Sequence, residues 1–169
     1  MFFTLKQERC PFCGCAESLN RHSFLYGNDP VTPDGQILRG QRVFCSDRGQ
    51  RGGCGRTFSV FLAPIFPRHT VSAPLLWPLL VQMLSGQSIK ACAEALRLPF
   101  GLETLYHLLG RLRRRLDVVR SCLCRRQTAP ASGQLTPLGQ TVEHLQAVFG
   151  GASCPPADYQ THFGTAFLG

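Results

Sequence analysis

Lysine is almost missing from this 169-residue chain, in which two lysines accompany sixteen arginines. Only ten acidic residues oppose these bases, which leaves a formal net charge of +8. A guanidinium group presents a rigid fork of donors that fits phosphate better than the point charge of an ammonium group does. The composition therefore favours a polyanionic partner, above all nucleic acid, over a charge that serves solubility alone.

Long hydrophobic runs are also missing. The longest, residues 73–84, has twelve residues with two prolines, whereas a membrane-spanning helix needs about 20 apolar residues. The first nine residues are too polar for a signal peptide. We therefore expect no membrane partner and a cytoplasmic, nucleoid-associated protein. In that reducing compartment the nine cysteines serve as metal ligands or buried side chains more often than as disulfides.

Catalytic signatures are absent too: the chain has no phosphate-binding loop, no dinucleotide-binding motif and no Ser-His-Asp arrangement, so we expect no enzyme. Basic residues are absent after Arg126. The charge is +4 over residues 1–72, +6 over residues 73–126 and −2 over residues 127–169. These three segments are the predicted domains, and the first two are expected to face a polyanion.

A paired set of cysteines indicates a metal site in the first segment. Cys10 and Cys13 are separated by two residues and followed by Gly14, which is typical of a zinc knuckle whose backbone curls around sulfur. Cys45 and Cys54 form a second pair with eight residues between them. Those residues are polar and rich in glycine and can loop out. The sequence predicts that these four thiolates bind Zn²⁺ in a tetrahedron.

Other ligand-type residues in this segment compete weakly for the metal. Cys15 is too close to Cys13 to complete a knuckle comfortably, and His22 and His69 are weaker rivals. Alternating short stretches predict a small antiparallel sheet, which depends on metal for its folding energy. Its strands are expected at residues 23–26, 36–38, 41–44 and 57–61.

Arginines cluster around the second cysteine pair. We predict that Arg42 and Arg56 contact phosphates there. The alternative is that these arginines form a solvent-exposed loop face that binds no ligand.

The second segment has the pattern of a helix-turn-helix. Ser72 is the expected cap of a first helix that ends at Gly86, with Pro78 either kinking or beginning it, and Ser88 caps a short second helix over residues 89–96. A turn at residues 97–99 leads to a longer basic helix from about Phe100. Its early residues are expected to meet base edges: Gly101, Glu103, Thr104 and His107. For Glu103, a favourable charge at the helix N-terminus is preferred over a cytosine contact.

An apolar seam continues along the third helix from Leu102 to Leu123 at alternating spacings of three and four. A parallel homodimer through this seam would place like-charged arginines together. We therefore expect the seam to pack within its own chain, while self-association stays possible. The flanking arginines are then predicted to contact phosphates: Arg111, Arg113, Arg114, Arg115 and Arg120. Cys122 and Cys124 point to different sides of a helix and are not expected to bind metal.

The third segment reads as a linker followed by a short helical tail. Thr136 and Pro137 are a favourable helix start. One apolar face follows, up to Phe149, and a last helical turn is expected after Cys154.

Several of these stretches resemble one known family. Cys-Pro-x-Cys-Gly at residues 10–14, together with residues 39–45 and 53–59, looks like the N-terminal zinc ribbon of bacterial insertion-sequence transposases. Residues 88–98 and 103–106 resemble the helix-turn-helix that follows the ribbon in those proteins. This chain departs in the wide second cysteine pair and in Arg97, where a glycine is usual. The resemblance implies a Zn²⁺ cofactor, double-stranded DNA as the ligand and a transposase as a candidate protein partner.

Such transposases continue into an RNase H-like domain that holds three metal-binding acids. Here only Asp117, Glu143 and Asp158 follow the recognition helix, and the residues around them are too few to build that sheet. We expect no strand-transfer catalysis.

The sequence thus predicts an α+β protein: an antiparallel zinc ribbon, then an all-α helix-turn-helix with a long basic third helix. The expected function is zinc-dependent DNA binding as an accessory or regulatory factor of a mobile element. The alternative is an interaction module that docks on a transposase or polymerase through the ribbon and the apolar tail.

Overall fold

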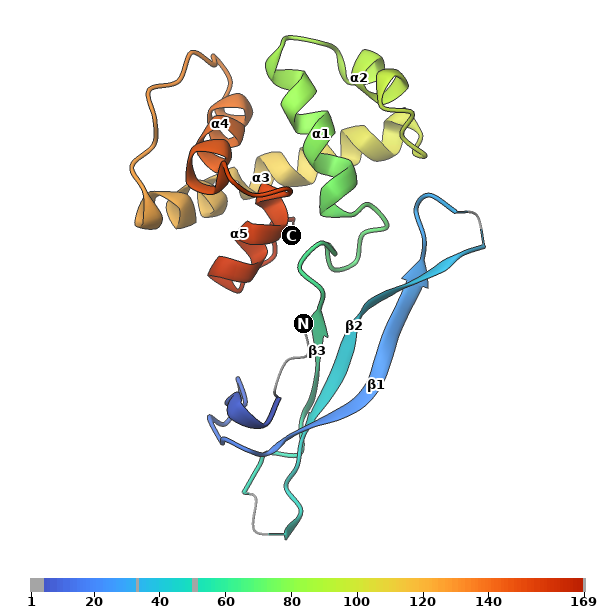
Figure 1. Cartoon of the computed structure of the whole chain (residues 1–169), viewed down its shortest axis with the longest axis vertical. Helices are drawn as coiled ribbons and strands as arrows, with labels where there is room; N and C mark the ends of the chain where they lie inside the picture. Colours follow the sequence, from blue (N-terminus) through green and yellow to red (C-terminus); the bar gives the residue numbers. More distant parts are fainter. Residues whose placement is uncertain (1–4, 33, 50–51, 169) are drawn as a thin grey trace. The chain divides into compact units, whose positions relative to one another are not determined.

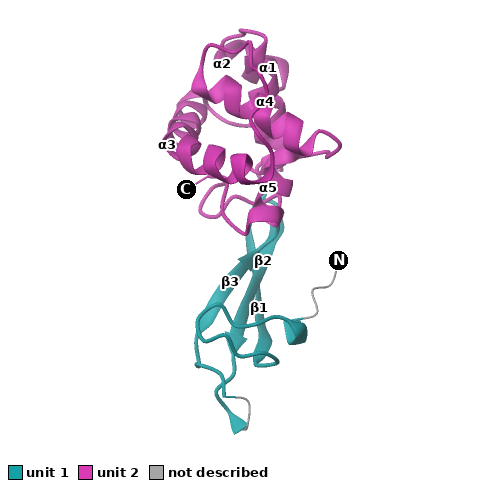
Figure 2. Ribbon diagram, turned by 90° about the vertical axis from the view of Figure 1, so that its left-hand side faces the viewer, with its two compact units in different colours: residues 1–29, 34–62 teal, residues 30–33, 63–169 magenta. Residues whose placement is uncertain are grey.

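A computed structural model describes residues 5–32, 34–49 and 52–168 of the chain (Figure 1). It is an α+β protein that divides into two compact units (Figure 2). The first comprises residues 1–29 and 34–62, and the second comprises residues 30–33 and 63–169. This division differs from the predicted boundary at residue 72.

The segment after residue 62 belongs to the helices because its side chains and carbonyls are held there. Phe66 and Val71 are buried in the helical core. The Gln160 side-chain amide donates to the Ala63 and Ile65 carbonyls at 2.6 and 3.1 Å. Buried side chains between Leu138 and Leu168 also belong to that core, so this part of the predicted third segment is not a separate tail.

The first unit is built on a three-stranded antiparallel sheet with the order β1-β2-β3 (Figure 1). Leu19 lies opposite Cys45 at one end, and Phe44 of the central strand lies opposite Thr57. The predicted strands at 36–38 and 41–44 are one continuous strand, because β1 pairs along both of them. The elements are a 3₁₀ turn at Leu5–Gln7, β1 at Leu19–Asn28, β2 at Gln36–Cys45 and β3 at Thr57–Phe61.

The core of this unit is very small. Its fully buried apolar side chains are Cys10, Leu19, Val43 and Cys45, with Cys54 and a few others packed against them. Three of these five side chains are predicted ligands. So few apolar groups cannot offset the chain entropy of an ordered sheet, so a bound metal is expected to supply folding energy.

In its described residues the second unit has five helices (Figure 1). Two predicted caps are confirmed: Ser88 Oγ accepts from the Ala91 amide at 3.2 Å, and Thr136 Oγ1 accepts from the Gly139 amide at 3.1 Å. Pro78 lies inside the first helix and does not begin it. The helices are α1 at Ala73–Leu84, α2 at Ile89–Ala95, α3 at Leu102–Arg126, α4 at Pro137–Phe149 and α5 at Pro155–Phe163.

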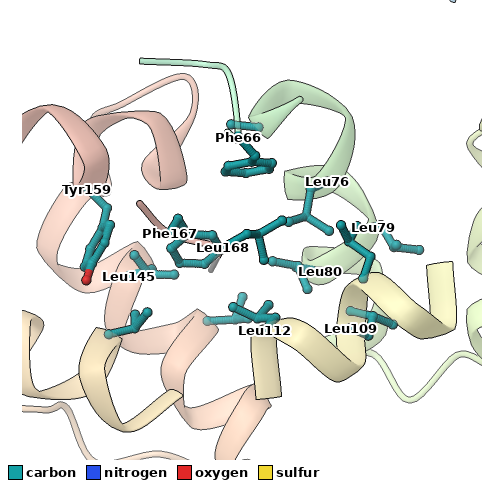
Figure 3. Close-up of a cluster of buried hydrophobic side chains, with 14 of the residues drawn as sticks. Phe66, Leu76, Leu79, Leu80, Leu109, Leu112, Leu145, Tyr159, Phe167 and Leu168 are labelled. Carbon is teal, nitrogen blue, oxygen red and sulfur yellow. The ribbon is translucent and has the colours of Figure 1, made fainter. Parts of the chain in front are cut away.

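One apolar core joins these helices (Figure 3). The predicted seam of α3 is buried from Leu105 to Leu123, and only Leu102 at its start is exposed. The seam therefore packs within its own chain, as expected, and is not free for a second copy. The apolar face of α4 and the aromatic residues Tyr159 and Phe167 are buried in the same core. None of the described helices is long and apolar enough to cross a bilayer.

Leu112 of α3 tests this core. Its side chain is 1% exposed, so Leu112→Ala is expected to lower the free energy of unfolding by about 2–5 kcal/mol, through lost burial and a residual cavity. Urea denaturation followed by helical circular dichroism measures the change. Leu135→Ala is the matched control because Leu135 is 98% exposed. Equal effects of the two substitutions would contradict the proposed core.

Candidate metal centre and nucleic-acid interface

Four cysteine sulfurs gather at one end of the sheet. The Sγ atoms of Cys10, Cys13, Cys45 and Cys54 all lie within 4.8 Å of one another. Cys10 and Cys54 are 3.8 Å apart and Cys13 and Cys45 are 3.7 Å apart. A tetrahedron with Zn–S bonds of about 2.3 Å has edges of about 3.8 Å, whereas a disulfide is about 2.05 Å long. The cluster could therefore hold a metal ion.

The first pair of ligands sits on a tight backbone turn. The Gly14 amide donates to the Cys10 carbonyl at 2.8 Å, and the Cys10 amide donates to the Cys15 carbonyl at 2.9 Å. Gly14 has a φ of +72°, which an L side chain rarely adopts, so glycine is needed after the second cysteine.

The second pair repeats this arrangement. The Gly55 amide donates to the Cys45 carbonyl at 3.0 Å, and the Cys45 amide donates to the Arg56 carbonyl at 2.8 Å. Gly55 has a φ of +70°. The two cysteine pairs therefore form equivalent knuckles despite their unequal spacing.

The long spacing is absorbed by a loop that closes on itself. The Gly53 amide donates to the Ser46 carbonyl at 3.0 Å, and the Cys54 amide approaches Cys45 Sγ at 3.3 Å. A Cβ on Gly53 would lie 2.8 Å from Cys45 Sγ and closer still to the Ser46 carbonyl. Ser46 and Gly53, the residues next to the two cysteines, thus take the places that Pro11 and Phe12 have in the first knuckle.

The proton affinities of the first knuckle reflect crowded sulfurs. Burial raises the pKa of Cys10, but hydrogen bonds from the Phe12 and Cys13 amides and the neighbouring thiols lower it to about 6. The Cys15 amide lowers the pKa of Cys13, but desolvation and contacts with the other sulfurs raise it to about 12. Cys10 therefore ionises readily, whereas the neighbouring sulfurs disfavour a second thiolate at Cys13. A bound cation would stabilise both thiolates.

The rival ligands lie outside the cluster. Cys15 Sγ instead donates to the Gly52 carbonyl at 3.0 Å, and His22 Nδ1 lies 3.3 Å from Ser23 Oγ. His69 belongs to the helical unit. Within residues 5–32, 34–49 and 52–168, the four cysteines are the only group of three or more ligand-type side chains placed to hold a metal.

The two arginines predicted near the second knuckle are both exposed. The Arg56 guanidinium lies 5.1 Å from the centre of the Phe12 ring, so it bridges from one knuckle to the other. Arg42 stands on β2 opposite Ser23 and Ser59.

The predicted base-reading residues lie at the exposed start of α3. Gly101 is the residue before the helix, and Glu103, Thr104 and His107 follow it in the first two turns. The Glu103 carboxylate lies 3.6 Å from His107 Nε2, with both side chains largely exposed. Its place in the first turn and this pairing favour a helix-stabilising role for Glu103.

The predicted arginines of α3 separate by the helical repeat. Arg111 and Arg114 follow His107 at spacings of four and three, so the three side chains share one exposed face. Arg113 and Arg120 are seven residues apart and share a flank of the helix. Arg125 is exposed and was not among the predicted phosphate contacts. It lies eleven residues, or three turns, after Arg114 and therefore on the same face of the helix.

Arg115 differs from the other arginines because it is tied inside the protein. Its side chain is half-buried, and its Nη2 donates to the Ala166 carbonyl at 2.9 Å. This bond holds the C-terminal segment against α3 and occupies a guanidinium that was predicted to contact phosphate.

The three acids that were weighed as catalytic candidates lie on separate helices. Asp117 is on α3, Glu143 on α4 and Asp158 on α5. Glu143 accepts a hydrogen bond from Ser132. In the described part of the chain these acids do not form a group that could hold a metal ion.

Comparison of the chain with protein-family models, with curated proteins and with solved structures finds no match.

Removal of one ligand tests the metal centre. Cys45→Ser is expected to abolish stoichiometric metal binding, because a serine hydroxyl does not replace a buried thiolate. Native mass spectrometry counts the metal ions on each chain. Cys15→Ser is the matched control, since Cys15 lies beside the cluster without joining it. If Cys15→Ser lost the metal and Cys45→Ser kept it, Cys15 would be the ligand and Cys45 would not.

Gly53 tests the closure of the second knuckle. Gly53→Ala forces a methyl group against Cys45 Sγ and the Ser46 carbonyl. Such overpacking costs about 1–3 kcal/mol, which corresponds to about a 5- to 150-fold loss of metal affinity. Competition with a chromophoric chelator measures that affinity. Gly133→Ala should leave it unchanged, because a methyl group there meets no atom within 4 Å. Unchanged affinity in Gly53→Ala would show that the knuckle does not need this closure.

Proposed function

We propose that this chain is a zinc-dependent DNA-binding protein in which Zn²⁺ holds a ribbon and α3 contacts duplex DNA. The exposed basic face of α3 carries the proposal. His107, Arg111 and Arg114 line this face, while the opposite face of the same helix is buried in the core. A helix so anchored presents a fixed row of guanidinium groups, which suits the phosphates that flank a groove.

The donor set favours zinc as the ion. Four thiolates in a tetrahedron are typical of structural zinc or of iron–sulfur sites. Two equivalent knuckles beside a three-stranded sheet are the arrangement of a zinc ribbon. All four ligand positions come from cysteines, so the proposed site is closed and structural, with no open position for catalysis.

The order of α2 and α3 supports a helix-turn-helix interpretation. The short α2 ends at Ala95 and the long α3 begins at Leu102. Cys92 and Ala93 of α2 and Leu105 of α3 are buried in the same core. Under this interpretation α3 is the recognition helix, and Thr104 and His107 in its first two turns approach base edges.

The resemblance of the ribbon and the following helices to insertion-sequence transposases suggests a biological role. On this basis the proposed role is that of an accessory or regulatory factor of a mobile element. Docking on a protein through the apolar tail gains no support, because Leu145, Tyr159 and Phe167 are buried in the chain's own core.

Neutralisation of the α3 face tests the proposal. The double substitution Arg111→Gln and Arg114→Gln should weaken duplex binding at about 50 mM salt and lower the salt slope, log Kd against log salt, by about 2, because each lost phosphate contact removes about 0.9. Fluorescence anisotropy with a labelled duplex of about 20 base pairs measures both quantities.

The matched control places the same charge change elsewhere. Ala147→Glu with Ser153→Glu also lowers the net charge by two, at exposed positions in the acidic last segment. This control should retain the slope of the wild-type protein. Equal losses in both double variants would reduce the effect to net charge, and undetectable duplex binding by the zinc-loaded wild type would refute the proposal.

A further inference from the structure

We propose that the sheet of the ribbon carries a separate site for unpaired nucleotides, in which Phe24 and Tyr26 stack on bases. This site deepens the proposed nucleic-acid function and rests on it for the class of ligand. It uses other residues than the basic face of α3, so the two can be tested independently.

One face of the sheet carries an exposed apolar strip, which consists of Phe24, Tyr26, Leu38 and Val60. Directly opposed residues of an antiparallel sheet project to the same face, and Phe24 lies opposite Gln41, which lies opposite Val60. Tyr26 lies opposite Leu38. The Phe24 and Tyr26 rings lie 6.4 Å apart, which places both on this face.

The strip is open where the rest of the same face is closed. Toward the cysteines the face is covered, since Val43 and Leu19 are buried there. Farther along, Phe24 is 56% and Tyr26 60% exposed, and Leu38 and Val60 are each 39% exposed. Two large aromatic side chains left this open indicate a binding surface and not a part of the core.

The charges around the strip select the occupant. None of the residues in β1, β2 and β3 is acidic, whereas Arg21, which lies opposite Val43 on this same face, is basic. The five acidic residues of the first 62 all lie outside the strands. An aromatic strip whose strands lack carboxylates and whose face carries an arginine is complementary to single-stranded nucleic acid, whose bases stack on rings while a phosphate meets the cation.

Individual residues can be given roles in this site. Phe24 and Tyr26 would each hold one base, and the half-buried Gln41 beside Phe24 offers an amide to a base edge. Arg21 stands three residues before Phe24 on the same exposed strand and would meet a phosphate. Stacking accepts every base, so little sequence preference is expected.

The test compares single-stranded and duplex DNA on the zinc-loaded full chain. The double variant Phe24→Ala and Tyr26→Ala is expected to lose at least about tenfold in affinity for an oligo-dT of about 12 nucleotides, with duplex affinity within about twofold. Tyr26→Phe keeps the ring and should bind like the wild type. Phe61→Ala is the control and should also bind oligo-dT like the wild type. Phe61 is an aromatic residue of the same sheet and is 38% exposed, but it lies opposite Gly40, next to Val60, and so projects to the other face.

Photocrosslinking gives a second readout that does not depend on folding of a variant. An oligonucleotide that carries 5-iodouracil should crosslink to the tryptic peptide of residues 22–39, which contains both rings. Unchanged oligo-dT affinity in the double alanine variant, as a protein-docking strip would give, or crosslinks confined to α3, would overturn the proposal. Single-strand binding lost with the rings but duplex binding absent in the wild type would sustain this site and refute the α3 function.

Discussion

The first unit depends on one constraint, namely that four sulfurs must meet at the end of a thin sheet. Cys10 and Cys45 are buried and lie next to few other apolar groups, so the cluster takes the place that a hydrophobic core has in a larger domain. The amide hydrogen bonds at each knuckle and the glycines at positive φ serve that geometry. The helical unit, by contrast, is held by an ordinary leucine and aromatic core.

The sequence was most informative where a residue has a single local purpose. Ser88 and Thr136 were recognised as caps because a side-chain oxygen before a helix has one obvious partner. The four cysteines were recognised because paired thiols followed by glycine form knuckles. The spacing of the apolar residues in α3 also predicted the buried seam from Leu105 to Leu123, since the 3.6-residue repeat of a helix determines which side chains share a face.

What the sequence could not show depends on contacts between distant residues. Arg115 looked like its exposed neighbours, yet its partner is a carbonyl fifty-one residues later. Residues 63–72 looked like an extension of the ribbon, but the hydrogen bonds from Gln160 and the burial of Phe66 and Val71 in the helical core show that they belong with the helices. The strand limits were short for a similar reason, because pairing with neighbours extends β2 through residues that have little strand preference themselves.

The closed loop between the metal ligands has a consequence for variation. The hydrogen bond from the Gly53 amide to the Ser46 carbonyl brings the two ends of the insertion together next to Cys45, so the positions of Cys45 and Cys54 are fixed at these ends. Loop closure entropy grows slowly with length. The number of residues inserted between Ser46 and Gly53 can therefore change at a small cost in free energy, and a variant or a designed protein could carry a different sequence there while it keeps the same pair of cysteines.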